Sequence, residues 1–201
     1  MRLPPLLVLT DRSQCDRPLR EVVSTAVDAG TRAVVLREKD LSADERAALA
    51  DELRTVLDPV GGVLVHAGLA GLAGAAGIGA VHLSSKDAFP SPRPWLVGRS
   101  CHSADEVSRA VTEACDYVFL SPIFPTASKP GYGPAMGLDR LARLTAGAPP
   151  VYALGGVGVD DVGGCLAAGA YGVAVMGPVM RDPRIVAAYL AALGAGPAHR
   201  T

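Results

Sequence analysis

Two histidines lie at the ends of apolar segments, where an imidazole could take part in chemistry. His66 closes the run VLVHA, and His102 follows Ser100 in the stretch GRSCHS. An imidazole titrates near neutrality, so it can both give and take a proton under physiological conditions. The alternatives are that His66 only fills space at a rim and that His102 is a helix-start residue with a satisfied ring. His82, three residues into its own apolar run, is interpreted as structural.

Cations and hydroxyl groups that suit an anionic ligand occur in two other stretches. In LREKD, Arg37 and Lys39 fall on the same side of an extended segment. Two cations that point to one place favour an anionic substrate, whereas the alternative is a strand end whose cations pair with Glu38 and Asp40. The stretch PIFPTASKPGYGP predicts a long loop, which is either a binding loop or simply solvated. This loop adds three candidate ligands for a phosphate or carboxylate: Thr126, Ser128 and Lys129.

Glycine-rich turns end two successive apolar runs, YALGGVG and VAVMGPV. Glycine lets a ligand approach the backbone closely, and backbone N–H groups at a helix N-terminus bind phosphate. A tight turn alone would explain one such glycine, but two turns in successive units favour a phosphate site. The predicted site consists of Gly155, Gly156, Met176 and Gly177.

Short apolar runs alternate with segments of helical character along the chain. The runs are continuous, as expected for parallel strands that are covered on both faces. Ser42 with Glu45 and Ser103 with Glu106 have the spacing of capping boxes at helix starts. Strands are predicted at 6–10, 32–38, 62–67, 80–84, 95–100, 116–123, 150–156 and 171–177, and helical segments at 19–30, 42–58, 103–115, 159–169 and 182–194.

Eight strand-then-helix units predict a single α/β domain, a compact (β/α)₈ TIM barrel over residues 1–195 with a tail at 196–201. The main alternative is a doubly wound open sheet. In a barrel, function belongs at the C-terminal ends of the strands. The candidate residues follow or end apolar runs, so a barrel would bring them to one rim.

The composition excludes several classes of function. The formal net charge is −1, so no basic surface for nucleic acid or membrane headgroups is expected. The apolar runs are too short to span a bilayer, and the stretch MRLPPLLVLTD does not have the pattern of a signal peptide. The four cysteines have no CxxC spacing, which argues against zinc and for a reducing cytosol. A cytoplasmic protein is expected, and a homo-oligomer is left open.

Seven motifs, taken in order, resemble the thiamine phosphate synthase/TenI superfamily. Their joint order and spacing carry the resemblance over nearly the whole chain, and they imply a barrel that binds a small phosphorylated thiazole. The motifs are LVLTD (7–11), VVLREKD (34–40), AVHLSSKD (80–87), VGRSCHS (97–103), SPIFPTASK (121–129), YALGGV (152–157) and GVAVMG (172–177).

The resemblance implies different chemistry for the two branches of this superfamily. Thiamine phosphate synthases join hydroxymethylpyrimidine diphosphate to a thiazole phosphate, with Mg²⁺ holding the leaving diphosphate. Their pattern Gln-Leu-Arg-Glu-Lys is VLREK here, with Val35 in place of the glutamine, and their Asn-Asp pair is His66-Ala67. Of the two metal carboxylates in that pattern only Asp87 remains, and one aspartate is a poor Mg²⁺ site.

TenI-like members depart from the synthase pattern at the same places, with a histidine where His66 stands and a GRS-x-HS motif as in 98–103. This resemblance predicts a thiazole tautomerase, an isomerase that shifts a proton on a thiazole carboxylate phosphate without a metal or other cofactor. In this interpretation His102 or His66 moves the proton and Arg37 and Lys39 face the carboxylate, while the glycine turns hold the phosphate.

Two alternatives stay open beside the tautomerase. One is a Mg²⁺-dependent synthase, which the loop of Thr126, Ser128 and Lys129 favours because it matches the synthase pattern T-x-T/S-K. Asp87 would then be a metal ligand. The other is a non-catalytic, regulatory barrel that binds phosphate.

Overall fold

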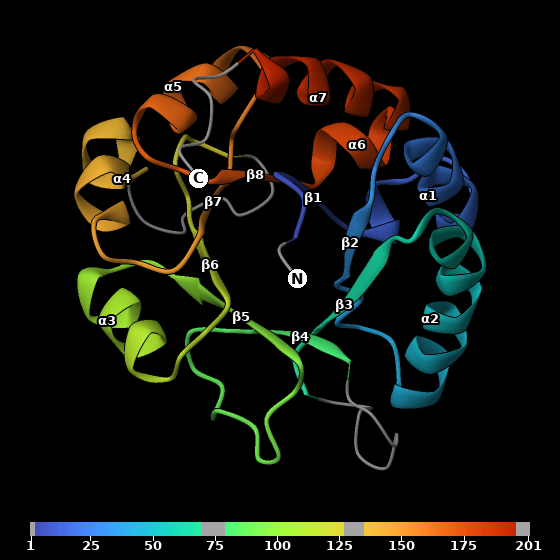
Figure 1. Cartoon of the computed structure of the whole chain (residues 1–201). Helices are drawn as coiled ribbons and strands as arrows, with labels where there is room; N and C mark the ends of the chain where they lie inside the picture. Colours follow the sequence, from blue (N-terminus) through green and yellow to red (C-terminus); the bar gives the residue numbers. More distant parts are fainter. Residues whose placement is uncertain (1–2, 70–78, 127–134, 196–201) are drawn as a thin grey trace.

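The computed structural model describes residues 3–69, 79–126 and 135–195 and shows a closed barrel of eight parallel strands (Figure 1). Each strand pairs with the next along the chain, and β8 closes the ring on β1. The prediction of a (β/α)₈ TIM barrel is confirmed, and the open-sheet alternative is wrong. The strands are β1 Leu6–Leu9, β2 Ala33–Leu36, β3 Val63–Ala67, β4 Ala80–Leu83, β5 Leu96–Cys101, β6 Tyr117–Leu120, β7 Val151–Leu154 and β8 Gly172–Val175.

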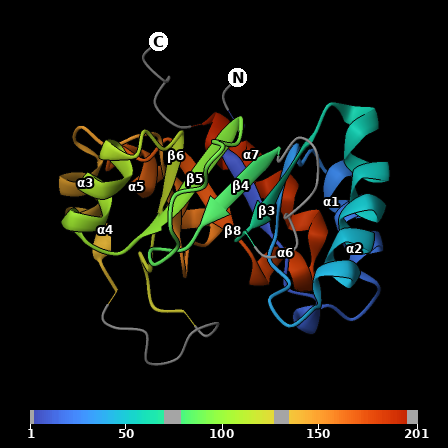
Figure 2. The ribbon, with the colours of Figure 1, turned by 90° about the horizontal axis from the view of Figure 1, so that it is seen from below.

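Helices surround the barrel, with α1 and α2 along one side and α3, α4 and α5 along the other (Figure 2). Short 3₁₀ turns begin or extend several of the connections. The helices in the described part of the chain are α1 Leu19–Asp28, α2 Ala43–Leu57, α3 Ala104–Thr112, α4 Gly137–Thr145, α5 Val162–Ala167, α6 Gly177–Arg181 and α7 Val186–Gly194, and the 3₁₀ turns are η1 Arg12–Gln14, η2 Asp58–Val60, η3 Val159–Asp161 and η4 Pro183–Ile185. None of these helices is long and apolar enough to cross a membrane.

The fourth unit departs from the prediction, because the described residues 84–95 between β4 and β5 form no helix. This segment contains Pro90, Pro92 and Pro94, and proline breaks a helix by removing a backbone donor and clashing with the preceding turn. The predicted strands are right, but the prediction of eight complete strand-then-helix units is wrong at this place. The connection between β3 and β4 falls partly on residues 70–78, outside the described residues.

The two predicted helix starts differ in how their caps are completed. At α2, Ser42 and Glu45 form a full capping box, in which each side chain binds the backbone of the other residue. At α3, the Ser103 hydroxyl accepts from the Glu106 N–H, but the Glu106 carboxylate accepts from the backbone N–H of His102. The second cap therefore ties the start of α3 to the residue that precedes it, His102.

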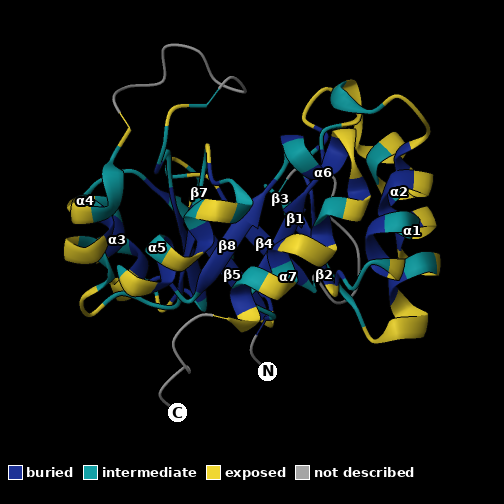
Figure 3. Cartoon of the chain, turned by 90° about the horizontal axis from the view of Figure 1, so that it is seen from above, coloured by how far each residue is buried: buried dark blue, intermediate teal, exposed yellow. Residues whose placement is uncertain are grey.

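Most strand residues are buried (Figure 3), although Val63, Leu64 and Ala67 of β3 are half-buried. Side chains along each strand alternate between the barrel interior and the layer under the helices. The inner cluster includes Leu7, Val35, Val65, Phe119 and Tyr152. The outer cluster, packed under the helices, includes Leu6, Val34, Val81, Val118 and Val173. Whether a strand residue faces the interior or the helices thus decides whether it can reach a site at the end of the barrel.

The N-terminal segment closes the end of the barrel at which the strands begin. The hydroxyl of Tyr152 donates to the Pro4 carbonyl at 2.9 Å, and the hydroxyl of Tyr171 donates to the Leu3 carbonyl at 2.9 Å. Both tyrosine rings belong to the inner cluster or pack against it. A ligand therefore has the opposite, C-terminal end of the strands available, which is the mouth of the barrel.

Candidate active site

Side chains from distant parts of the sequence meet at the mouth. Arg37 follows β2 and its Nη1 lies 4.0 Å from the sulfur of Met176, which follows β8. The backbone N–H of Arg37 donates to the Thr10 hydroxyl at 2.9 Å, which fixes the start of the segment after β2. The predicted residues at 37 and 176 are therefore brought together above β1, the strand between β2 and β8.

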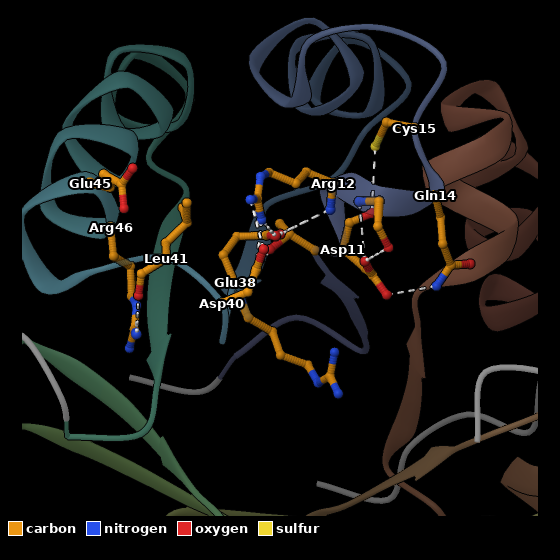
Figure 4. A network of polar contacts seen from close by, with 12 residues as sticks. Asp11, Arg12, Gln14, Cys15, Glu38, Asp40, Leu41, Glu45 and Arg46 are labelled. Atoms are coloured by element: carbon orange, nitrogen blue, oxygen red, sulfur yellow. Dashed lines mark hydrogen bonds and ion pairs between the residues drawn. The ribbon is translucent and has the colours of Figure 1, made fainter. Parts of the chain in front are cut away.

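The two carboxylates that follow Arg37 in the sequence, Glu38 and Asp40, are bound to another arginine, Arg12 (Figure 4). The buried Glu38 accepts from the backbone N–H of Arg12 and pairs with its guanidinium at 3.2 Å. Asp40 pairs with the same guanidinium at 2.7 Å, and this hydrogen bond holds the pKa of the Asp40 carboxyl below its usual value. Among the described residues, no carboxylate forms an ion pair with Arg37 or Lys39. The alternative in which these two cations pair with Glu38 and Asp40 is wrong.

His102 is held at the mouth between β5 and β6. Its Nδ1 lies 2.7 Å from the carbonyl oxygen of Ser121, to which it donates. Its own carbonyl accepts from Arg140 of α4 at 3.2 Å. Because Nδ1 carries the proton in this hydrogen bond, a contact between the ring and a substrate would involve Nε2. This geometry keeps His102 a candidate for contact with a substrate.

His66 lies on the other side of the barrel wall. Its neighbours Val65 and Ala67 pack in the barrel interior, so the His66 side chain points outward. Its Nε2 lies 3.3 Å from Arg54 of α2. Burial, followed by the charge of Arg54, lowers the pKa of His66. The prediction of His66 as a catalytic residue does not agree with this geometry, because a side chain on the outer face of β3 cannot reach the mouth.

The glycines of the predicted phosphate site have a packing explanation. Gly155 and Gly156 have φ values of +90° and +69°, which favour glycine. A Cβ on Gly156 would lie 2.4 Å from the Pro125 carbonyl oxygen, and one on Gly177 would lie 2.9 Å from Arg181 and from Gln14. Protein atoms therefore occupy the space that these glycines leave open, and phosphate binding by their N–H groups stays a prediction.

The segment after β6 is described only as far as residue 126 and again from residue 135. Thr126 is half-buried, whereas Ser128 and Lys129 lie outside the described residues. Their predicted contact with a phosphate stays a prediction.

Sequence reasoning missed one member of this region, His82. It lies inside the barrel, with its Nε2 2.8 Å from the Ser100 hydroxyl and its ring stacked on Phe119 at a centroid distance of 4.0 Å. Ser100 is half-buried at the mouth, as the prediction of a substrate contact requires. No alternation in AVHLS signals the direction of His82, and its inward orientation follows from the structure, where it pairs with Ala67, an inward-facing residue of β3.

The residues present do not fit a magnesium site of the kind that the synthase pattern implies. Ala67 faces the interior but has no ligand atom, and His66 faces outward. Asp87 Oδ2 accepts from the Ser84 N–H at 2.7 Å, so one of its two carboxylate oxygens is engaged in the turn over residues 84–87. The described residues contain no group of three His, Cys, Asp or Glu side chains that could hold a metal ion.

Comparison with known proteins places this barrel in a family. The sequence profile of the thiamine monophosphate synthase family matches residues 6–179. A thiamine-phosphate synthase of Methanoregula boonei is 35% identical over 94% of this chain and 90% of its own length. One from Thermobifida fusca is 35% identical over 92% and 89%. The solved thiamine phosphate pyrophosphorylase of Pyrococcus furiosus superposes with a TM-score of 0.78 and 26% identity over 94% of this chain and 95% of its own.

These relatives overturn the predicted tautomerase, because they carry the name of the other branch and match along the whole barrel. The missing metal carboxylate at Ala67 therefore does not mark an isomerase. The superfamily resemblance itself is confirmed, and the chain is an enzyme that belongs to the thiamine monophosphate synthase family.

Proposed function

We propose that this enzyme is a thiamine-phosphate synthase, a transferase that joins hydroxymethylpyrimidine diphosphate to a thiazole phosphate and releases diphosphate. Beside the similarity to the relatives, the observation that carries the proposal is that two cations, Arg37 and Lys39, follow β2. Arg37 is half-buried at the mouth and, like Lys39, forms no ion pair with a carboxylate among the described residues, while Arg12 binds the neighbouring Glu38 and Asp40. Unpaired cations at a barrel mouth suit substrates that carry a diphosphate and a phosphate.

In this reaction the thiazole nitrogen forms a bond to the methylene carbon of the pyrimidine, and the bond from that carbon to the diphosphate oxygen breaks. The diphosphate leaves with the electron pair, so negative charge develops on its bridging oxygen. Arg37 and Lys39 would bind the diphosphate and stabilise that charge. Arg37 is half-buried and Lys39 is exposed, so Arg37 would contribute more, because a fixed cation in a partly buried site acts without reorganisation. We assign no step to a metal ion, since the described residues do not form a site for it.

The remaining predicted residues would hold the second substrate. The turns at Gly155–Gly156 and Met176–Gly177 are the proposed contacts for the thiazole phosphate. Ser100 and His102 would contact the reacting groups from β5. Thr126, Ser128 and Lys129 would bind phosphate from the loop after β6. The four free thiols suit a reducing compartment, so we place the reaction in the cytosol.

The direct test is to incubate the purified enzyme with both substrates, with Mg²⁺ and with EDTA, and to measure thiamine phosphate and released diphosphate. We expect both products in equal amounts. The variant Arg37→Met should lower kcat/KM by roughly 100-fold, since a charge-assisted contact to a diphosphate is lost. The matched control is Arg54→Met, the same change on the outer side of the barrel, which should leave kcat/KM unchanged. A wild-type enzyme that forms neither product under either condition would refute the proposal.

A further inference from the structure

A chain of three hydrogen-bonding side chains runs through the barrel interior to the mouth. The Tyr117 hydroxyl lies 3.1 Å from His82 Nδ1, and His82 Nε2 lies 2.8 Å from the Ser100 hydroxyl. Tyr117 and His82 are buried, with 1% and 6% of their surfaces exposed. Ser100 is half-buried, so it is the member of the chain that a ligand can reach.

The arrangement of protons in this chain follows from the position of Tyr117. A buried hydroxyl needs an acceptor for its proton, and within the described residues His82 is the hydrogen-bond partner of the Tyr117 hydroxyl. Tyr117 therefore donates to Nδ1. A neutral imidazole carries one proton, so that proton is on Nε2 and is donated to the Ser100 oxygen. The reverse arrangement would leave the buried tyrosine proton without an acceptor.

The surroundings keep the imidazole neutral and in place. Burial, with a smaller contribution from the charge of Arg99, lowers the pKa of His82 to about 3. The ring stacks on Phe119 with 4.0 Å between centroids. Gly98 makes room for the tyrosine, since a Cβ there would lie 2.1 Å from the Tyr117 ring. The chain of side chains is thus fixed by packing on several sides.

We infer that Tyr117 and His82 are positioning residues that make the Ser100 hydroxyl a hydrogen-bond donor toward the mouth. Because the Ser100 oxygen accepts from His82, its own proton is available to an acceptor on the ligand. Phosphoryl oxygens are acceptors, and the assignment of the ligand as a diphosphate substrate rests on the proposed function. The arrangement of protons itself does not depend on that function.

The first test measures the tautomer of His82 directly by ¹⁵N NMR of the wild-type enzyme. We expect a proton on Nε2 and an unprotonated, hydrogen-bonded Nδ1 at neutral pH. In Tyr117→Phe, the Nδ1 resonance should shift because its hydrogen bond is lost. In the control Phe119→Leu, which removes the stacked ring but no hydrogen bond, Nδ1 should keep the signature of an acceptor. A wild-type His82 with its proton on Nδ1 would overturn the inference, whatever reaction the enzyme catalyses.

The second test uses inorganic pyrophosphate as the probe and calorimetry as the readout. We expect Ser100→Ala to weaken binding roughly tenfold and Tyr117→Phe about threefold, as for the loss of one hydrogen bond and of its orientation. Phe119→Leu should bind pyrophosphate as the wild type does. The double variant should bind no more weakly than Ser100→Ala alone. If Tyr117→Phe weakens binding equally in the Ser100→Ala background, the tyrosine does not act through Ser100 and the inference is wrong.

These outcomes are separate from those that test the synthase activity. An enzyme that fails to form thiamine phosphate but shows the expected His82 tautomer and coupled pyrophosphate binding would refute the proposed function alone. An active synthase with the opposite tautomer would refute the inference alone.

Discussion

Two histidines on adjacent strands show how differently the two faces of the barrel wall are used. His66 on β3 and His82 on β4 are both buried, and burial lowers the pKa of each. In the register of the two strands, His66 pairs with Val81 and Ala67 pairs with His82. The His66 side chain therefore points outward to Arg54, while the His82 side chain points inward to Ser100. Both histidines lie near the site along their strands, and they differ in which face of the barrel wall carries the side chain.

The outer face near these histidines is used for stability. On β5, Arg99 points outward, is fully buried and pairs with Glu113 at 2.6 Å. Its guanidinium also donates to the carbonyl oxygens of Ser84 and Asp87, and Arg109 donates to the Asp87 carbonyl as well. These arginines hold the segment that lacks a helix between β4 and β5. The comparison teaches that outward polar residues here support the wall, whereas inward ones reach the mouth.

The largest effect that this comparison predicts is on stability at Arg99. Arg99→Met should lower the free energy of unfolding by about 3–5 kcal/mol, because it leaves Oε2 of Glu113 and the Ser84 carbonyl oxygen without their buried cation, while Arg109 still binds Glu113 Oε1 and the Asp87 carbonyl. Urea unfolding measures the change. The control is Arg93→Met, which removes a half-exposed pair with Asp116 and should cost at most about 1 kcal/mol. Equal losses in the two variants would mean that the outer face has no special structural role at β5.

The next prediction contrasts the effects on activity of His102, at the mouth, and His66, on the outer face. His102→Ala should lower kcat/KM roughly 100-fold, since its ring is fixed at the mouth by the Ser121 carbonyl and an acid–base or substrate contact is lost. His66→Ala should leave kcat/KM within about twofold and lower stability instead, because Arg54 loses its partner on β3. Steady-state assays at saturating and limiting substrate concentrations measure kcat and kcat/KM for both variants. A large loss of activity in His66→Ala with an intact fold would contradict the assignment by face.

The positions of the strands could be predicted from the sequence because each is a continuous apolar run. The predicted strand at 116–123 contains β6, and the predicted strand at 62–67 contains β3. The same continuity hides the direction of the side chains. Where both faces are apolar there is no alternation to reveal which residues point inward, so VLVHA did not show that His66 faces a helix and AVHLS did not show that His82 faces the site.

Other features depend on contacts between segments that are far apart in the sequence. The need for glycine at 156 arises from the carbonyl of Pro125, which reaches it from the loop after β6. The buried Arg99 finds its carboxylate partner in Glu113, the residue that caps the C-terminal end of α3. Residue types alone predicted Arg37 as a cation for an anionic ligand, but its freedom from Glu38 and Asp40 follows from Arg12, which no local pattern connects to them.

The smallest predicted effect, over a single pH unit, is the pH dependence of stability, and it compares how deeply the two histidines are buried. Both have a pKa below the ordinary value of about 6.5 in the folded state. Below pH 6.5 the unfolded chain therefore binds protons that the folded chain does not, so stability is highest above that pH and falls as the pH decreases. A histidine that stays neutral in the folded chain contributes a slope of up to about 1.4 kcal/mol per pH unit. For His82 the loss continues until the folded pKa of about 3.

Urea unfolding of the wild type and both variants at several pH values between 7.5 and 4 measures this slope. His82→Gln and His66→Gln should each reduce the slope of stability against pH between pH 6 and 5 by up to about 1.4 kcal/mol per pH unit, the contribution of one proton, whatever their stability at pH 7.5. The comparison uses differences within each variant, so a change in overall stability does not disturb it. At pH 4, where the ring enclosed in the barrel still excludes the proton, His82→Gln should differ more from the wild type than His66→Gln does, because burial lowers the pKa of a fully enclosed ring further. An unchanged slope in His82→Gln would mean that His82 takes up a proton in the folded state, and the neutral imidazole required for the donation to Ser100 would then be lost.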